Sequence, residues 1–497
     1  MSMPTILFPT PSDGQSGHGY LWAFILAALL ITALRVAYLA CSFHPLYGDE
    51  AQYWDYGRDL AFGYYSKPPV IAWLTRASTE LFGVSEFAVR LPMPLLHAGT
   101  ATGLYALGTH LFGARIGFWG GLVYLTLPGV SLSAQLNSTD PPMMLFWAWA
   151  LYALARALEN GRRLTWAIAG ALLGLSLLSK YTAVAFVLSL VILLWRDRDM
   201  RAIGRSAGPK LFALAAVIVF SPNLFWNAQH GFASILHVGE NADITSNQVI
   251  NPDEFGDFFG AQFGVFGPIL FLVLLVMLAQ TRKLSSDARY ALLLSFSWPL
   301  LLIICVQALL SKANANWAAP VYLSASVAVS AWLIESGRML WLRVSLVLHI
   351  IAFIAMNSFQ PILDARGVEY LPRKLDPVRK LRGWRDFGEE IKALRAEHPG
   401  AFLLFDDRKA MAEALFYADA TLDDAIMWDP DGRPNNHYEL MTDLEDARGQ
   451  PVLLIARRGL DGPSERFNQR TDLPPIEIRT HRDRVEVWQV ALLRDLR

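Results

Sequence analysis

Residues suited to acid–base chemistry are concentrated in one segment near the N-terminus, residues 47–69, which reads YGDEAQYWDYGRDLAFGYYSKPP. The segment combines five tyrosines and one tryptophan with six charged residues, namely Asp49, Glu50, Asp55, Arg58, Asp59 and Lys67. A carboxylate can accept a proton from a hydroxyl group, and cations can stabilise a developing negative charge. The aromatic rings allow stacking and partial burial beside these charges, so the segment is a candidate site and not a linker.

Further polar residues occur in breaks between apolar runs. Asp140 lies in the break QLNSTDPP (135–142), and Lys312 lies in the turn SKANANW (311–317). Lys180 separates two short apolar runs, where a lysine is costly unless it faces a partner or a cavity. Taken singly, Lys67 fits a solvated loop lysine and the tyrosines fit an aromatic belt at a membrane interface. Carboxylates presented by two separate breaks favour a functional site.

The elements that must position these residues are those of a membrane protein. The chain is 54% hydrophobic and 18% charged, with a positive mean hydropathy. The segment before the first apolar run lacks the basic region of a cleavable signal peptide, so we expect this run to be a retained helix. Apolar runs near the length of a bilayer crossing recur along the chain. They predict about eleven spans, near 20–41, 88–111, 116–133, 141–158, 164–179, 181–195, 211–227, 263–280, 290–310, 318–335 and 341–357.

The runs 164–179 and 181–195 decide the orientation, because one merged helix would reverse every later span. With two helices, the loops rich in arginine and lysine all fall on one side, which the positive-inside rule assigns to the cytoplasm. The segment 47–69 and the breaks at 135–142 and 311–317 then lie outside the cytoplasm.

The chain changes character after residue 357. Short strands are predicted at 401–406, 452–456 and 485–491, with a helix at 408–418. We therefore predict a mainly α, polytopic membrane protein with two domains. Residues 1–357 form the transmembrane module with its outer catalytic loops, and 358–497 form a charged connector and a small α/β domain outside the cytoplasm. Cys41 and Cys305 lie in or beside apolar runs, which predicts free thiols.

Several motifs together resemble the membrane glycosyltransferases of the GT-C class. In order along the chain they are GDEAQYWDYGRDL, YYSKPPVIAWL, FAVRLPM, NSTDPP and LGLSLLSKYTA. In particular, the chain resembles the bacterial relatives of the protein O-mannosyltransferases and of the lipid A aminoarabinose transferase, families 39 and 83. The resemblance covers about the first two hundred residues and continues loosely through SKANANW, RKLRGWRDF and NNHYEL.

This resemblance implies a GT-C type helical module with a cavity open to the periplasm. It also implies transfer of a sugar, hexosyl or pentosyl, from a polyprenyl-phosphate carrier by a single inverting displacement. Asp49 is the candidate base, Asp140 is the second loop carboxylate, and Glu50 is an alternative. Lys67 is the first candidate to hold the donor phosphate, helped by Arg58, Lys180 or Lys312. The expected sugar or acceptor pocket contains Tyr53, Tyr64, Tyr65 and Trp317.

One departure from the family pattern concerns a metal. In the aminoarabinose transferases a glutamate precedes the lysine of the Lys-Pro motif and takes part in metal binding, whereas this chain has Ser66. We therefore expect no required cofactor, and side-chain cations rather than an essential divalent metal at the donor phosphate. The expected partners are a polyprenyl-phosphate-linked sugar, a glycolipid or lipopolysaccharide acceptor and membrane lipids, without nucleic acid. The expected location is the bacterial inner membrane, with the catalytic loops and the C-terminal domain in the periplasm.

Two other classes of function remain open at this point. A transporter or flippase of lipid-linked sugars would place ionisable groups near the membrane midplane at an internal repeat. This chain shows no convincing repeat and concentrates its charges in outer loops. An assembly protein that binds partners through its α/β domain would require the carboxylates to be dispensable. The family resemblance favours a lipopolysaccharide or lipid A component as the acceptor over a protein.

Overall fold

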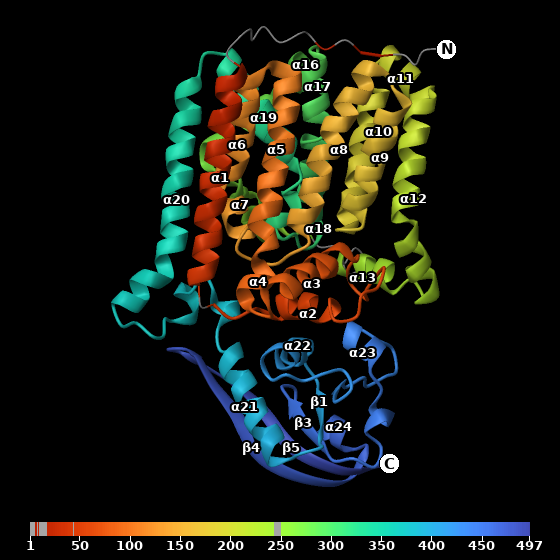
Figure 1. Ribbon diagram of the computed structural model, residues 1–497, viewed down its shortest axis with the longest axis vertical. Coiled ribbons are helices and arrows are strands. Elements are labelled where there is room, and N and C mark those ends of the chain that lie inside the picture. The colour runs from red at the N-terminus through yellow and green to blue at the C-terminus, as the bar shows by residue number, and fades with distance from the viewer. Residues whose placement is uncertain (1–4, 7, 9–16, 43, 243–249) are drawn as a thin grey trace. The chain divides into compact units, whose positions relative to one another are not determined.

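The computed structural model describes residues 5–6, 8, 17–42, 44–242 and 250–497 (Figure 1). The chain divides into two compact units. The first, here called the membrane unit, comprises residues 1–40, 67–71 and 90–358. The second, called the loop–sheet unit, comprises residues 41–66, 72–89 and 359–497. Residues 41–89 are here called the outer loop, after the side of the membrane expected for them. Except for 67–71, the outer loop belongs to the same compact unit as the C-terminal domain.

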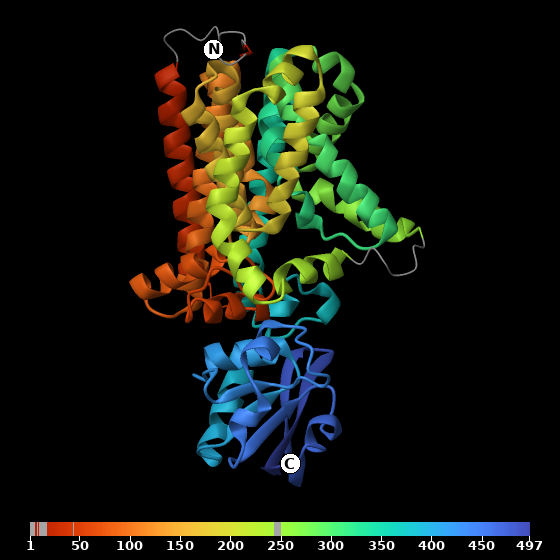
Figure 2. The same ribbon diagram turned by 90° about the vertical axis from the view of Figure 1, so that its right-hand side faces the viewer.

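The membrane unit is helical, and its long helices run side by side (Figures 1 and 2). Its elements are α1 (Gly17–Cys41), α5 (Pro92–Phe112), α6 (Ala114–Thr126), α7 (Pro128–Ser133), α8 (Asp140–Asn160), α9 (Arg163–Leu177), η1 (Tyr181–Val184), α10 (Ala185–Trp195), α11 (Arg198–Arg205), α12 (Ala207–Gln229), α13 (Ala233–Ala242), α14 (Pro252–Val265), α15 (Pro268–Ala279), α16 (Thr281–Leu284), α17 (Ala288–Ser295), α18 (Trp298–Leu310), η2 (Ala315–Ala318), α19 (Val321–Glu335) and α20 (Met339–Ala365). The last turns of α20 belong to the loop–sheet unit.

Judged by helix length and composition alone, only some of the expected spans are long and apolar enough to cross a membrane. Among the described residues, four stretches qualify, namely Gly17–Cys41, Ala207–Gln229, Ala288–Leu310 and Met339–Ala365. The bent pair α14 and α15 would make a fifth. Each run expected from the sequence overlaps a helix of the structure, but several of these helices are short or interrupted. The count of about eleven spans therefore stays a prediction.

Two interruptions in the helices of the membrane unit can be located, at Lys180 and at Gly267. The helix α9 ends at Leu177, and Lys180 is extended before η1 begins at Tyr181, so the expected break at Lys180 is present. The axes of α14 and α15 differ by 114°, and Gly267 lies between them with φ of 85°. A Cβ atom at this glycine would collide with the ring of His349, so a bend of this kind requires glycine.

The loop–sheet unit contains a mixed sheet in the order β2-β1-β3-β5-β4. The strands are β1 (Phe402–Phe405), β2 (Ala425–Met427), β3 (Val452–Ala456), β4 (Phe467–His481) and β5 (Arg484–Leu496), and β1 is parallel to both β2 and β3. The helical elements are α2 (Gly48–Tyr56), α3 (Val70–Phe82), α4 (Glu86–Arg90), η3 (Arg373–Leu375), η4 (Arg379–Leu381), α21 (Trp384–Glu397), α22 (Arg408–Tyr417), α23 (His437–Met441), η5 (Leu444–Ala447) and α24 (Asp461–Ser464). The first residues of α3 belong to the membrane unit.

Side-chain alternation along β1 and β3 builds a core on each face of this sheet. Leu403 and Phe405 face one core and Leu404 faces the other, as expected for a strand with both faces covered. The first core also contains Leu46 and Ala51 from the outer loop. The loop is therefore part of the hydrophobic core of this unit, a relationship that the expected boundary at 357 did not include.

Candidate active site

The helix α2 presents its first two carboxylates in different directions. Glu50 is fully buried, and its Oε2 accepts a hydrogen bond of 3.3 Å from the backbone N–H of Tyr47. A glutamate three residues after the helix N-cap commonly closes a capping box in this way. Glu50 therefore stabilises the start of α2, which leaves Asp49 as the carboxylate of this pair that faces a neighbouring helix.

Asp49 forms an ion pair within the loop–sheet unit. Its Oδ1 accepts a hydrogen bond of 2.8 Å from Nη2 of Arg408, and Nη1 of the same arginine contacts Gln52 one turn further along α2. Burial opposes the charge of Arg408, but the Asp49 carboxylate outweighs this effect and raises the pKa of Arg408 above its usual value. Arg408 is therefore a permanent cation beside the candidate base.

Asp55, also on α2, is more buried than Asp49 and has Arg58 beside it. Burial raises the pKa of Asp55 to about 7, and the nearby Arg58 partly offsets that increase. The Arg58 guanidinium lies 3.6 Å from Asp55 and donates a hydrogen bond of 3.1 Å to the carbonyl oxygen of Ala420. Arg58, expected to help hold the donor phosphate, thus joins the outer loop to the α/β region.

The tyrosines expected in a sugar pocket are buried in this unit. Tyr53, Tyr64 and Tyr65 are 5%, 2% and 6% exposed. The ring of Tyr64 stacks on Tyr56 at 4.3 Å, and the Tyr65 hydroxyl donates a hydrogen bond of 2.9 Å to the carbonyl oxygen of Pro434. Through these contacts the rings stabilise the loop–sheet unit. Their contact with a sugar stays a prediction.

A second polar cluster lies in the membrane unit. Asp140 begins α8, and its two carboxylate oxygens have different partners. Oδ1 accepts a hydrogen bond of 2.7 Å from Nζ of Lys180, and Oδ2 accepts one of 2.9 Å from Nδ2 of Asn316. Asp140 is only 7% exposed. This carboxylate thus joins three breaks that the sequence marked separately, and Lys180 is engaged with it.

The segment that carries Lys67 lies beside the same cluster. The backbone N–H of Val70 donates a hydrogen bond of 3.1 Å to the carbonyl oxygen of Leu178, two residues before Lys180. Lys67 itself is half-buried and directly precedes Pro68, whose ring restricts the backbone conformation of the lysine. Lys312 is exposed, four residues before Asn316. Trp317 is partly buried against the main core of the membrane unit.

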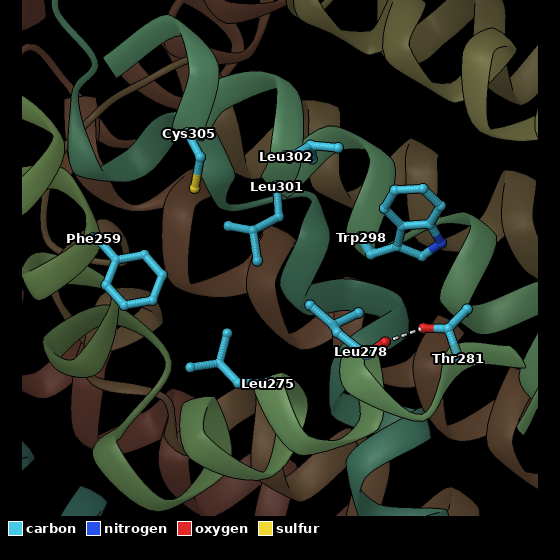
Figure 3. Close-up of a pocket in the computed structure, with 8 residues that line it drawn as sticks. All are labelled: Phe259, Leu275, Leu278, Thr281, Trp298, Leu301, Leu302 and Cys305. Carbon is cyan, nitrogen blue, oxygen red and sulfur yellow. Dashed lines mark hydrogen bonds between the residues drawn. The ribbon is translucent and has the colours of Figure 1, made fainter. Parts of the chain in front are cut away.

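An apolar pocket of about 330 Å³ opens between helices of the membrane unit (Figure 3). Its lining comes from α14, α15, α16 and α18 and comprises Phe259, Leu275, Leu278, Thr281, Trp298, Leu301, Leu302 and Cys305. The hydroxyl group of Thr281 donates a hydrogen bond of 2.7 Å to the carbonyl oxygen of Leu278. The lining left for a ligand is therefore mainly hydrocarbon, which suits a lipid chain.

Some residues at these clusters were not singled out from the sequence. Arg408 and Gln52 are such residues, and Asn316 was noted only as part of a motif. The signal for Arg408 was the run DDR directly after a short apolar strand, a position where α/β sheets often bind ligands. Among the described residues, no group of three or more histidine, cysteine, aspartate or glutamate side chains is arranged to hold a metal ion.

Comparison with known proteins identifies the class to which this chain belongs. Residues 66–226 match the family described as dolichyl-phosphate-mannose-protein mannosyltransferase. The lipid A galacturonosyltransferase RgtD of Rhizobium johnstonii is 34% identical over 424 residues, which cover 84% of this chain and 86% of RgtD. The chain therefore belongs to the GT-C class of membrane glycosyltransferases, as its sequence motifs predicted.

Other relatives and solved structures agree with this class. The lipopolysaccharide core galacturonosyltransferase RgtB of the same organism is 27% identical over 215 residues, covering 41% of this chain and 42% of RgtB. The crystal structure of ArnT from Cupriavidus metallidurans bound to undecaprenyl phosphate has a TM-score of 0.63 at 15% identity. The structural match covers 96% of this chain and 98% of ArnT, so the two proteins share a fold. The protein is thus a multi-pass membrane glycosyltransferase with an ArnT-like fold and a small C-terminal sheet.

Proposed function

We propose that this protein transfers a hexuronic acid from a polyprenyl-phosphate carrier to lipid A or another lipopolysaccharide acceptor. The observation that carries the proposal is the similarity to RgtD over 84% of the chain, a share larger than the membrane unit alone. The name of RgtD supports lipid A as the acceptor and galacturonic acid as the sugar. This proposal is more specific than the expectation from the sequence, which was a hexosyl or pentosyl group.

The lipid-linked donor is supported by two separate observations. A solved structure with the same fold contains undecaprenyl phosphate, which makes a polyprenyl phosphate the natural carrier here. The apolar pocket of the membrane unit provides hydrocarbon surface of the kind that an isoprenoid chain would cover. The positive-inside rule supports a periplasmic reaction at the inner membrane.

The proposed reaction is a single displacement. The acceptor hydroxyl oxygen attacks the anomeric carbon of the donor sugar, and Asp49 takes up the proton of that hydroxyl group. The bond between the anomeric carbon and the phosphate oxygen breaks, its electron pair remains on the polyprenyl phosphate, and the anomeric configuration inverts. Lys67 is the first candidate to stabilise the departing phosphate, because Pro68 and Pro69 constrain its backbone beside the acidic cluster.

Mass spectrometry of lipid A and lipopolysaccharide core from cells with and without the gene tests this proposal. The expected result is loss of a hexuronic acid from one of these lipids in the deletion strain, with restoration by the intact gene. Unchanged lipids with altered protein glycosylation would instead support a protein acceptor. Carrier-linked sugar accumulating on the cytoplasmic side would support the flippase alternative.

A further inference from the structure

We propose that Arg408 is a positioning residue for the transfer reaction, and that its guanidinium orients the Asp49 carboxylate toward the acceptor hydroxyl. This inference rests on the proposed function, and it gives the C-terminal α/β region a part in the chemistry. Arg408 and Asp49 lie 359 residues apart in sequence and 2.8 Å apart in the loop–sheet unit.

The position of Arg408 is determined by the strand and helix on either side of it. The strand β1 ends at Phe405, and Asp407 is the N-cap of α22. The Asp407 carboxylate accepts hydrogen bonds of 2.8 and 3.0 Å from the backbone N–H groups of Lys409 and Ala410. Such a cap fixes the start of a helix, so Arg408 projects from a defined point at the carboxyl end of a parallel strand.

The location is an unfavourable one for a cation unless it has a specific partner. Arg408 is the first residue of α22, where the helix dipole repels positive charge. Burial also opposes its charge. The contacts to Asp49 and Gln52 offset both effects, and the planar guanidinium can engage the two side chains at once through different nitrogens. A lysine would supply charge without this two-point geometry.

Close packing limits how far Asp49 can move. Gly48 immediately precedes it, and a Cβ atom built on Gly48 would lie 2.5 Å from Cγ and 3.2 Å from the backbone Cα of Lys409. The start of α2 therefore approaches α22 at a distance that any larger residue would disturb. Close packing against Lys409 therefore holds the backbone beside Asp49, and the ion pair with Arg408 holds the carboxylate itself.

The electrostatic surroundings leave Arg408 as a strong influence on Asp49. Among the described residues, Tyr53 and Tyr56 interact electrostatically with both members of the pair, and Tyr438 interacts with Arg408. Tyr47 lies near Tyr53, Asp55 lies near Tyr56 and Tyr438, and Lys409 packs against Gly48. Burial raises the pKa of Tyr53, Tyr56 and Tyr438 above the usual value of tyrosine, so these phenols stay neutral near pH 7. The guanidinium thus favours the charged, proton-accepting form of the carboxylate.

The test uses the purified full-length protein with a polyprenyl-phosphate uronic acid donor and lipid A as acceptor. Arg408→Gln should lower kcat by about 10- to 100-fold while the donor KM changes by less than about 3-fold. The acid limb of its pH–rate profile should move to higher pH, because the carboxylate loses the cation that favours its charged form. Arg408→Lys should bring the acid limb back toward its wild-type pH but restore kcat less, because lysine supplies the charge without the two-point geometry.

Arg385→Gln is the matched control. Arg385 pairs with Glu86 at 2.5 Å, so it also joins the outer loop to the α/β region, but through a different carboxylate. Its kcat and pH profile should stay close to those of the wild type. Arg408→Gln should cause no further loss of kcat in an Asp49→Asn background, because the two side chains act through one carboxylate.

Three outcomes would overturn the inference. A normal kcat and pH profile in Arg408→Gln would show that the guanidinium has no part in the reaction. Equal losses in Arg385→Gln and Arg408→Gln would show that both arginines only attach the loop. A wild-type protein that transfers no sugar would refute the proposed function, and with it the role of Arg408. If the wild type is active, either of the first two outcomes refutes only the role of Arg408.

Discussion

The ammonium nitrogen of Lys180 lies 2.7 Å from Oδ1 of Asp140, and this ion pair joins two breaks between helices that are 40 residues apart in sequence. The lysine side chain is 20% exposed and the aspartate side chain 9% exposed, so both charges are partly removed from water. Asn316, in a third break, donates a hydrogen bond to the other carboxylate oxygen of Asp140. The pair therefore joins these breaks beside the segment that carries Lys67.

Removing one charge of this pair should destabilise the protein more than replacing both. Asp140→Leu leaves an uncompensated ammonium group and Lys180→Met an uncompensated carboxylate, each expected to cost on the order of 1–3 kcal/mol. The double variant should recover part of this loss. Thermal unfolding of the purified variants gives the coupling energy, and Arg196→Gln, which breaks an exposed pair with Asp197, is the control. Additive single effects would contradict a coupled pair.

Lys67 should matter through its charge. A phosphate diester at the membrane surface meets a dielectric constant below that of water, where a cation contributes more than on an ordinary protein surface. Lys67→Ala should therefore raise the donor KM by on the order of 10-fold or more, and Lys67→Arg should retain most donor use. Activity should persist in EDTA. Complete loss in EDTA, reversed by Mg²⁺ or Zn²⁺, would show that a metal holds the phosphate and that Lys67 is secondary.

Single cysteines should report the orientation in a background in which Cys41 and Cys305 are replaced by serine. Cysteines at Asn314 and Asn435, both exposed, should react with an impermeant maleimide in intact spheroplasts. One at Ala202, exposed on α11, should react only after the membrane is permeabilised. Protection at both Asn314 and Asn435, together with reaction at Ala202 in intact spheroplasts, would mean that the break at Lys180 does not separate two spans.

Asp55 predicts a stability that depends on pH. Burial raises its folded-state pKa to about 7, above the value near 3.9 of an unfolded aspartate, so the native state binds more protons between these values. Stability should therefore fall as pH rises from about 4 to about 7. Asp55→Asn should raise the melting temperature clearly at pH 8 and little at pH 5, corresponding to roughly 1–4 kcal/mol at the higher pH. Asp59→Asn, at an exposed position, is the control. Equal shifts at both pH values would argue that Asp55 has an ordinary pKa.

The central strands of the sheet were predictable because their character is local. β1 and β3 are covered on both faces, so each reads as a continuous apolar run. β4 was missed because it carries charges and two prolines, which an edge strand with an exposed face tolerates. β2 has three residues and was too short to recognise.

The candidate residues were predictable in type, but their pairing required the fold. Asp49, Asp140, Lys67 and Lys180 stand out because charges are rare in an apolar chain, and four of the relevant motifs follow one another in the first two-fifths of it. Arg408 comes from the opposite end of the chain, in a region with many arginines. No periodicity or spacing connects it to Asp49, because the contact depends on how α2 packs against α22.

Sugar transfer by the purified protein in liposomes tests the central claim most directly. The liposomes would contain lipid A and a polyprenyl-phosphate uronic acid, and mass spectrometry would detect lipid A carrying one added sugar. The wild type should form this product, and Asp49→Asn, which keeps the size of the side chain and removes its charge, should form it at least about 10²-fold more slowly with donor binding retained. Near-normal turnover in Asp49→Asn would contradict the assignment of the base, and absence of product with the wild type would contradict the proposed reaction itself.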